Sequence, residues 1–312
     1  MLIYLLRRLL FAAALVFTVS SGSLLLTRLA PGDYASDALG IGANRERLAE
    51  MRAKYGLDRP IFDPYRDWLV GAVRFDFGRS LANGRPVAEL ISEGASNTAV
   101  LAVTALLLAT LVGLPLGVVT GSRRDGVVAG IVRMASVFLL SMPPLLTSLF
   151  LVFLAARTGW FPIGGMSSIG GGFSDRVHHM VVPVLALALP LSAMFERLQS
   201  QATSEVVGQP FVLAAFARGV PRSRLIWRDA LKPALRPVAS VYGLVIGTLL
   251  SGSFAVEVIT TWPGLGSLML NALRARDVYL VAGCAAAGAV FLAAGTLLSD
   301  AALALVDPRA SE

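Results

Sequence analysis

Residues 98–121 read TAVLAVTALLLATLVGLPLGVVTG, a run of 24 residues without a charged side chain. About 20 apolar residues in helical form span the hydrocarbon core of a bilayer, so this run predicts a membrane-spanning helix. Of the 312 residues in the chain, 55% are hydrophobic and 15% are charged, whereas a soluble globular domain has about 25% charged residues. The mean hydropathy of +0.70 also excludes a disordered chain. We therefore expect a protein that lies largely in lipid.

A single cysteine, Cys284, and a net charge of +7 exclude further classes of protein. One thiol cannot form a disulfide framework, a zinc cluster or an iron–sulfur cluster. Excess positive charge occurs in proteins that bind nucleic acid, but in membrane proteins it comes mostly from loops that stay inside the cell. We expect the lipid bilayer, and not nucleic acid, to be a partner of this chain.

Six uncharged or nearly uncharged stretches are candidates for membrane spans. Because lipid offers no partner for backbone N–H and C=O groups, each is expected to be an α-helix. The predicted fold class is an all-α polytopic membrane protein with six transmembrane helices, in a single domain of residues 1–312. The predicted spans cover about 9–27, 98–121, 134–156, 180–200, 238–257 and 278–299.

The first span has an alternative interpretation as a cleaved signal peptide. Arg7 and Arg8 would be its basic start, and residues 20–23 a cleavage zone of small residues. Hydrophobic residues resume at Leu24, however, and make an uncharged run of 19 residues that ends before Arg28. We favour a helix that is retained in the protein.

The distribution of Lys and Arg predicts the orientation of the chain. With the N-terminus inside, cytoplasmic segments hold 13 basic residues, seven of them between spans four and five, and the short outer loops hold four. The N- and C-termini are therefore expected to be cytoplasmic. Two connections are long enough to carry function or partners: an extracytoplasmic loop at about 30–97 and a cytoplasmic loop at about 201–237.

The extracytoplasmic loop has helical patterns of its own. Residues 44–52 have helical character, and Asp58-Arg59-Pro60 follows as a helix breaker. Beyond it, Tyr65, Trp68, Leu69 and Val73 recur at helical spacing. Such apolar residues favour the membrane surface or the loop's own core over a ligand site.

Several chemical groups that enzymes and carriers need are missing from the sequence. Neither Lys54 nor Lys232 stands in the G-x-x-x-x-G-K-[ST] pattern of a phosphate-binding loop. Apart from Glu257 at the end of span five, we expect no ionisable side chain inside a span, whereas proton-coupled carriers keep such groups in the membrane. His178 and His179 are adjacent and point in different directions on a helix, so they predict interfacial residues rather than a metal pair. We expect no catalytic residue and no metal site.

Glycine and proline are frequent inside the predicted spans, as at Gly113, Pro115 and Gly117 and at Pro143-Pro144. Small residues allow close packing of membrane helices, and prolines kink them. Two interpretations remain open: simple packing, or kinked helices that line a path which opens and closes. A path without fixed charges would have to be driven from outside the membrane.

The cytoplasmic loop contains the most distinctive pattern, GQPFVLAAFARGVPRSRLIWRDALKPALRP at residues 208–237. It predicts a short helix with an Ala-rich face, a stop at Gly219 and a second, basic helix that leads into span five. Arg228, Lys232 and Arg236 recur every four residues and share one helix face. Taken alone, such a basic face also fits a surface held against anionic lipid headgroups.

This pattern resembles the EAA loop of ATP-binding cassette (ABC) importer permeases, through Ala214-Ala215-x-x-x-Gly219, Arg228-Asp229-Ala230-Leu231 and Ala234-Leu235-x-Pro237. More narrowly, the chain resembles the B-type permease of dipeptide, oligopeptide and nickel importers. The similarity covers nearly the whole chain, and its other matching strings follow in family order at 28–33, 55–60, 77–81, 84–87, 113–117, 159–162, 262–266, 275–277 and 307–309. The chain departs from the pattern at Leu213, where the family has the Glu of the loop's name, and at Pro210 and Pro221. The first departure removes one possible ion pair with an ATPase, and the prolines could shift the helix ends.

The resemblance implies the type I ABC importer permease fold and a multi-pass position in a bacterial or archaeal cytoplasmic (inner) membrane. It implies three kinds of protein partner: a homologous second permease subunit, two ABC ATPase subunits and an extracytoplasmic substrate-binding protein. The chain itself would bind no cofactor, since ATP and Mg would be bound by the partner ATPase subunits.

The resemblance also implies site residues. A coupling helix at about Phe211 to Arg224 would contact an ATPase through Phe211, Ala214, Ala215, Arg218, Gly219, Val220, Pro221 and Arg222. The binding protein is expected against the 30–97 loop, with contacts at Asp33, Gly78, Arg79 and Ser80. Candidate residues of the translocation path are Ser141, Pro143, Ser251 and Ser253, although small hydroxyls in membrane helices commonly bond to the backbone.

The predicted function is therefore the permease subunit of an ATP-driven, binding-protein-dependent importer, without enzymatic activity of its own. Di- or oligopeptides are the expected substrate; nickel, glutathione or another small solute is the alternative within the same family. Two alternatives from other classes are a stand-alone secondary carrier or channel, and a scaffold or intramembrane enzyme without transport activity.

Overall fold

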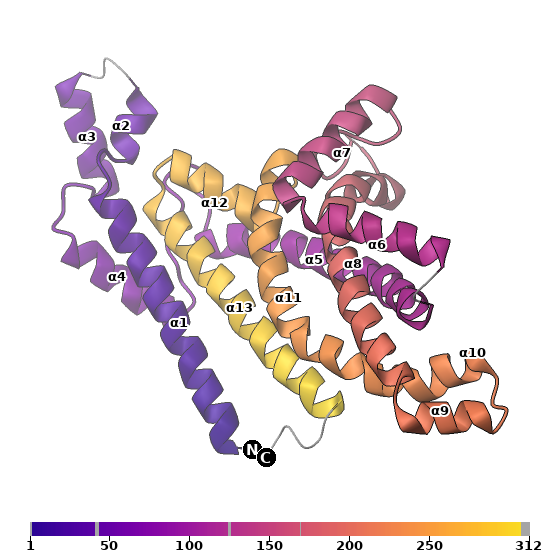
Figure 1. Cartoon of the computed structure of the whole chain (residues 1–312). Helices are drawn as coiled ribbons and strands as arrows, with labels where there is room; N and C mark the ends of the chain where they lie inside the picture. The colour runs from indigo at the N-terminus through magenta and orange to yellow at the C-terminus, as the bar shows by residue number, and fades with distance from the viewer. Residues whose placement is uncertain (1, 41–43, 124–125, 169, 307–312) are drawn as a thin grey trace. The chain divides into compact units, whose positions relative to one another are not determined.

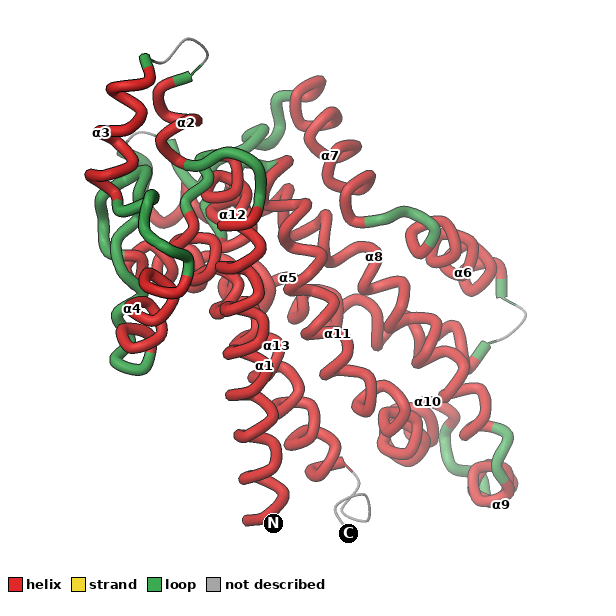
Figure 2. Tube along the Cα trace, turned by 90° about the vertical axis from the view of Figure 1, so that its left-hand side faces the viewer, coloured by secondary structure: helices red, strands yellow, loops and turns green. Residues whose placement is uncertain are grey.

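The computed structural model describes residues 2–40, 44–123, 126–168 and 170–306, and these form helices joined by loops (Figure 1; Figure 2). The described residues contain no β-strand, only an isolated bridge between Arg79 and Pro86. The elements in chain order are α1 (Leu2–Leu29), α2 (Tyr34–Leu39), α3 (Arg45–Tyr55), α4 (Phe62–Ala72), α5 (Val87–Ser122), α6 (Val127–Leu140), α7 (Pro144–Thr158), α8 (Phe173–Val207), α9 (Pro210–Ala217), α10 (Arg222–Arg224), the π-helix η1 (Leu225–Ala230), α11 (Leu231–Ile259), α12 (Leu265–Arg274) and α13 (Val278–Val306).

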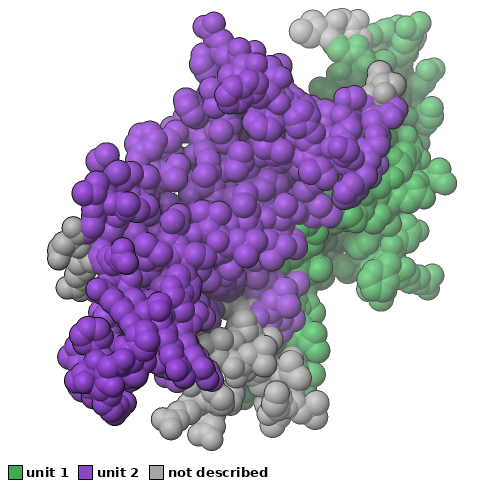
Figure 3. Space-filling model, turned by 90° about the vertical axis from the view of Figure 1, so that its right-hand side faces the viewer, with its two compact units in different colours: residues 1–99, 263–293 green, residues 100–262, 294–312 purple. Residues whose placement is uncertain are grey.

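The chain divides into two compact units (Figure 3). Unit 1 consists of residues 1–99 and 263–293, and unit 2 consists of residues 100–262 and 294–312. Of the three boundaries, those after residues 99 and 293 fall inside α5 and α13, which therefore contribute residues to both units, and the one after residue 262 falls between α11 and α12.

Four helices are long and apolar enough to cross a membrane, namely Leu6–Leu29, Val87–Ser122, Phe173–Val207 and Val278–Leu298. Two bent helix pairs are further candidates, and counting each pair as one span gives up to six spans. The first pair is α6 with α7, bent by 106°, and the second is Arg222–Gly247 with Gly252–Ile259, bent by 53°. The structure thus confirms the all-helical membrane fold.

The segment predicted as a span at 134–156 is not a straight helix, because α6 ends at Leu140 and α7 begins at Pro144. Pro143 holds an extended ψ of 148°. The ring of a proline disfavours the helical conformation at the residue before it, so Pro144 accounts for this ψ. Neither proline has an N–H group to continue the helical hydrogen-bond ladder.

The core of unit 1 explains the apolar pattern of the 30–97 loop. Trp68 on α4 packs in one buried cluster with Leu24 of α1 and Ala282 of α13, and Tyr65 and Leu69 pack against that cluster. A second cluster joins the first turns of α5 to α12 and α13. The helical spacing predicted in this loop therefore serves the unit's own core, apart from Val73, which is exposed.

The core of unit 2 forms around α8, which packs against α6, α7 and α11. Helix α8 also lies close to α5, because glycines recur every fourth residue along α5. A Cβ atom at Gly113 would lie 2.6 Å from the carbonyl oxygen of Ser192, and one at Gly117 would lie 2.6 Å from that of Glu196. These two glycines are therefore packing residues, as small residues often are between membrane helices.

Candidate functional site

The segment after α8 forms two short helices around a glycine turn. Helix α9 begins with Pro210 in its first turn and ends at Ala217. Gly219 holds a φ of +83°, and its N–H donates to the carbonyl of Phe216 at 3.0 Å while the N–H of Val220 donates to that of Ala215 at 3.3 Å. This is the hydrogen-bond pattern of a glycine-terminated helix.

The expected coupling helix at 211–224 is therefore two helices. The helix stop predicted at Gly219 is confirmed, whereas the assignment of one helix up to Arg224 is wrong. Pro221 starts a new short helix, α10, which continues into η1 and α11. The left-handed conformation at Gly219 reverses the chain direction and prevents one continuous helix.

Helix α9 presents apolar side chains outward. The exposed fractions are 49% for Phe211, 57% for Leu213 and 61% for Phe216, whereas Val212 is buried. Most other residues predicted to contact an ATPase lie exposed on the same segment, namely Ala214, Arg218, Gly219, Pro221 and Arg222, while Ala215 and Val220 are half-buried. Six of the eight predicted residues are therefore exposed and two are half-buried within the segment 211–222.

The segment at 210–226 contacts the rest of unit 2 through a hydrogen bond and through buried apolar side chains. Arg222 donates from Nη2 to the carbonyl oxygen of Ser122 at 2.6 Å, which ties α10 to the end of α5. Leu225 and Ile226 of η1 are buried and anchor the far side of the turn. Beyond them Arg228, Lys232 and Arg236 are all exposed, as a basic helix face requires.

A buried carboxylate lies within α8, where the sequence predicted none. The uncharged run ends at Phe195, but α8 continues as one helix to Val207. Glu196 is only 2% exposed, and Thr120 of α5 donates a hydrogen bond to its Oε1 at 2.6 Å. The prediction that spans lack ionisable groups apart from Glu257 is therefore wrong. Glu257 is itself buried, at the end of α11.

Glu196 belongs to a polar stripe on α8. Gln199 is fully buried and donates to Thr203 Oγ1 at 3.0 Å. A cavity of about 350 Å³ lies beside this stripe, and its charged lining residues are Arg133, Glu196 and Arg197. The spacing of Glu196, Gln199 and Thr203 by three and four residues is a sequence signal that would have placed them on one helix face, but it does not show that this face is buried. The expected lack of ionisable side chains in the spans therefore no longer argues against a proton-coupled carrier.

The residues predicted for a translocation path lie in unit 2 at two bends. Ser141 and Pro143 lie exposed at the break between α6 and α7, and Ser141 Oγ donates to the carbonyl of Val137 at 2.9 Å. Ser253 is buried and donates to the carbonyl of Leu250 at 2.9 Å, whereas the side chain of Ser251 lies outside the described residues. A Cβ atom at Gly252 would lie 3.8 Å from Pro144 Cγ, so the two bends are neighbours. Ser141 and Ser253 bond to their own helices, as expected of small hydroxyls.

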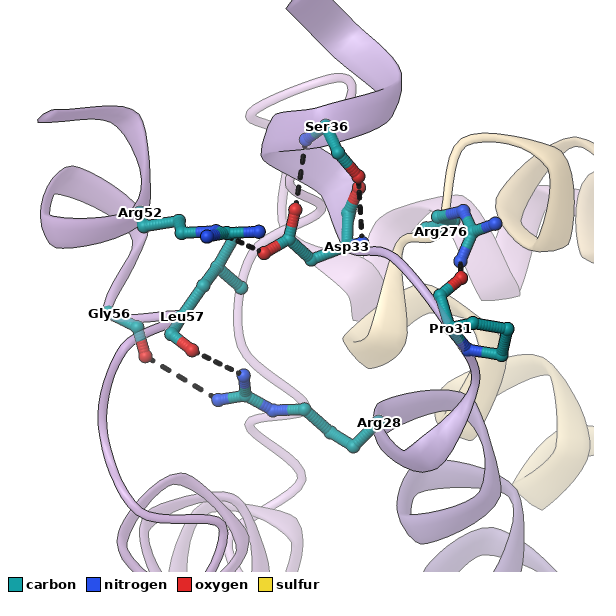
Figure 4. A network of polar contacts seen from close by, with 8 residues as sticks. All are labelled: Arg28, Pro31, Asp33, Ser36, Arg52, Gly56, Leu57 and Arg276. Atoms are coloured by element: carbon teal, nitrogen blue, oxygen red, sulfur yellow. Dashed lines mark hydrogen bonds and ion pairs between the residues drawn. The ribbon is translucent and has the colours of Figure 1, made fainter. Parts of the chain in front are cut away.

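Asp33, a predicted binding-protein contact, belongs to a polar network in unit 1 (Figure 4). Its Oδ1 accepts from the N–H of Ser36 at 2.9 Å and caps α2, and its Oδ2 accepts from Arg52 Nε at 2.7 Å. Burial alone would raise the pKa of the Asp33 carboxyl, but the hydrogen bonds from Ser36 and Arg52 and the charge of Arg52 hold that pKa below its usual range. Nearby, Arg276 donates to the carbonyl of Pro31.

The other three predicted contacts, Gly78, Arg79 and Ser80, form one arm of a short hairpin. Gly78 holds a φ of +83° and accepts from the N–H of Val87 at 2.9 Å, and Arg79 is exposed. Ser80 is buried and donates to Asp277 Oδ2 at 2.6 Å. Its side chain therefore supports the hairpin from inside rather than presenting a surface.

The turn before α13 connects both parts of the loop. Arg276 contacts Pro31, while the neighbouring Asp277 is fully buried and accepts from Ser80 Oγ, from the N–H of Ala82 at 3.2 Å and from the N–H of Leu280 at 3.2 Å. Arg276 and Asp277 belong to the string at 275–277 that resembles the permease family, but the sequence predicted no role for them. Their partners Pro31 and Ser80 lie 245 and 197 residues away in the chain.

Up to six apolar spans and the helical fold define a multi-pass membrane protein. Among the described residues, no group of three His, Cys, Asp or Glu side chains is placed to hold a metal ion. Residues 113–312 match the family described as binding-protein-dependent transport system inner membrane component, and residues 1–102 match the N-terminal region of such membrane components. The chain belongs to this family of inner membrane transport components.

Curated relatives match over nearly their whole length. The chain is 33% identical to the oligopeptide transport system permease protein AppB of Bacillus subtilis over 98% of each chain. It is 31% identical to the dipeptide transport system permease protein DppB of Escherichia coli, over 99% of this chain and 98% of the relative. It is 33% identical to the oligopeptide transport system permease protein OppB of Mycobacterium bovis over 98% of each chain.

Proposed function

We propose that this chain is the permease subunit of an ATP-driven importer for di- or oligopeptides, and that α9 couples it to cytoplasmic ATPase subunits. A homologous second permease would complete the translocation path, and ATP and Mg would be bound by the ATPases. A binding protein would deliver the peptide on the extracytoplasmic side, against residues 30–97. Both chain termini would then be cytoplasmic. The observation that carries the proposal is the exposed apolar surface of α9.

The geometry of α9 suits insertion into a groove of a partner. Burying an exposed Phe or Leu side chain contributes about 1.5–3 kcal/mol each, so Phe211, Leu213 and Phe216 supply a sizeable docking energy. Leu213 makes this contact apolar where the family pattern would place an ion pair. Because α10 continues through η1 into α11, movement of the docked segment would be passed to a membrane helix as a rigid-body displacement.

The peptide substrate rests on the names of the relatives, which are oligopeptide and dipeptide permeases. At the binding-protein side, Arg79 is the exposed member of the predicted contacts, and Ser80 would act by holding the hairpin in shape. Asp33 would act in the same indirect way, because Ser36 and Arg52 occupy its oxygens.

The double variant Phe211→Ser/Phe216→Ser tests the coupling role in the complete transporter. We expect ATPase co-purification with the membrane subunits to fall at least tenfold and ATP-dependent peptide uptake to be lost, with normal membrane insertion of the chain. Phe62→Ser in α4 is the control for ATPase co-purification alone, since Phe62 is equally apolar and 79% exposed but lies in the 30–97 loop, which is assigned to the binding protein and not to the ATPases. Gly219→Asp, which strains the turn, should uncouple the complex in the same way.

Normal ATPase co-purification together with normal uptake in the double variant would refute the coupling assignment. Uptake that persists when the ATPase subunits are omitted would favour a stand-alone carrier. A failure of the purified binding protein to retain any peptide would refute the substrate assignment alone.

A further inference from the structure

A cavity of about 260 Å³ lies in unit 1 beside the end of α1 and the start of α13. Its lining includes three arginines from distant parts of the chain, Arg28, Arg52 and Arg276, and one carboxylate, Asp33. Figure 4 shows Arg52 and Arg276 reaching Asp33 and Pro31 in the turn at residues 31–33, while Arg28 points toward Gly56 and Leu57. The formal charge of these lining groups is +2.

The guanidinium groups retain donors for a ligand. Within the described part of the chain, Arg28 donates to the carbonyls of Leu57 at 3.2 Å and Gly56 at 3.4 Å, Arg52 donates to Asp33, and Arg276 donates to Pro31. A guanidinium has five N–H groups, so these contacts position the arginines without using all their donors. Both oxygens of Asp33 are occupied by Ser36 and Arg52, and those of the nearby Asp277 by Ser80, Ala82 and Leu280.

The turn is shaped to admit Arg276. Gly32 holds a φ of +85°, and a Cβ atom there would lie 2.9 Å from Arg276 Nη1 and 3.0 Å from its Cζ. Any other residue would displace the guanidinium or strain the turn. The position of Arg276 at the cavity therefore depends on the absence of a side chain at residue 32.

The cavity lies at a membrane boundary. One candidate span ends at Leu29 and another begins at Val278, and both ends adjoin the cavity. Leu26 and Leu29, on the last turn of α1, are 70% and 72% exposed. A lipid whose acyl chain lies against these leucines would carry its headgroup phosphate at the height of the three arginines.

We propose that this cavity binds the phosphate of an anionic phospholipid headgroup. Arginine suits this role because its planar fork can donate two hydrogen bonds to one phosphate. The net positive charge favours phosphatidylglycerol over zwitterionic lipids, and a bound lipid would fasten the start of the 30–97 loop to α13. The inference is independent of the transported substrate and of the coupling role of α9.

The test uses the full-length chain in nanodiscs of phosphatidylglycerol and phosphatidylcholine in equal amounts, with retained lipid measured by native mass spectrometry after gentle extraction. One basic residue near an anionic surface contributes roughly a fivefold change in binding. We expect Arg52→Gln and Arg276→Gln each to lower phosphatidylglycerol retention by about that factor, and the double variant by roughly 25-fold if their effects add. Arg59→Gln, an equal charge change at an exposed pair with Asp67 in the same loop, should leave retention unchanged.

Asp33→Asn separates binding from structural support. Asparagine still caps α2, but the substitution raises the charge of the cavity, so phosphatidylglycerol retention should increase by up to about fivefold. A decrease in that variant, or unchanged retention in the arginine double variant, would overturn the proposal. Displacement of the lipid by millimolar inorganic phosphate would overturn it too, because the cavity would then be a site for the free anion.

Discussion

Two glycines, Gly32 and Gly219, have nearly the same positive φ, +85° and +83°, but they lie in different surroundings. A methyl group at Gly32 would meet the guanidinium of Arg276 at 2.9 Å. At Gly219, no described atom outside the turn lies within 4 Å of the corresponding position. The first turn is closed by other parts of its own chain, whereas the second is left open.

The same difference holds for the two long connections as wholes. The 30–97 loop is folded on itself, through the Asp33–Arg52 pair, the buried Trp68 and the Ser80–Asp277 hydrogen bond. The segment at 208–224 exposes Phe211, Leu213 and Phe216, but the 30–97 loop also exposes Phe62, Val73 and Phe75. The two connections therefore differ in the side-chain contacts that hold them, and not in the presence of uncovered apolar side chains.

The largest effect is expected at the closed connection, for Asp277→Leu. The change leaves Ser80 and two backbone N–H groups without their acceptor, and an unsatisfied buried donor costs about 1–3 kcal/mol. We expect destabilisation by about 3 kcal/mol or more, measured as a lower thermal unfolding midpoint in detergent. Asp67→Asn at an exposed ion pair is the control and should shift the midpoint little. Equal shifts for both variants would show that the loop is not held by Asp277.

An intermediate effect is expected for Gly32→Ala compared with Gly219→Ala. Both place a methyl group at positive φ, which costs about 1–2 kcal/mol, but only Gly32→Ala also displaces a side chain, for about 1 kcal/mol more. Thermal unfolding of the two variants measures the difference. Gly84→Ala measures the cost of a methyl group at positive φ within the same loop, since Gly84 has a φ of +67° and its added Cβ would meet no described atom within 4 Å. The comparison fails if Gly219→Ala destabilises the protein as much as Gly32→Ala.

The smallest effect is expected from the titration of Asp33. Its pKa is lower in the folded protein than its ordinary value of 3.8, so the folded state favours the carboxylate. This stabilisation is complete above the ordinary pKa and is lost as pH falls through the lowered one. We expect the stability difference between wild type and Asp33→Asn, about 0.5 kcal/mol for a partly exposed pair, to shrink as pH falls below the ordinary pKa of 3.8. Melting curves that run from neutral pH to well below 3.8 measure it, and a pH-independent difference would contradict the assigned contacts.

Much of the fold followed from the sequence because lipid imposes strict rules. Uncharged runs have to be helices, and the five uninterrupted predicted spans all lie in helices of the structure. The stop at Gly219 and the helical pattern of Tyr65, Trp68 and Leu69 were also predictable, since both depend on neighbours in the chain. The family strings placed the eight residues of the predicted coupling surface on one exposed segment.

Other features were not predictable from local patterns. Span four was predicted at 180–200, although its uncharged run ends at Phe195, and the burial of Glu196 was missed because its partner Thr120 lies on another helix. The Pro143-Pro144 pair indicated a kink but not a bend of 106°. Ser80 was expected at a surface, yet its partner Asp277 lies 197 residues away and holds it inside.

By itself, the sequence determined the helical class and the membrane location, because solvent preference and backbone geometry act residue by residue, and the family resemblance predicted the segment that a partner would meet. Only the tertiary structure decided which polar groups are buried and paired, and which apolar groups stay uncovered. Burial and pairing depend on side chains that distant helices bring to the same place, as at Glu196, Asp277 and the three arginines around Gly32. No pattern within one segment contains that information.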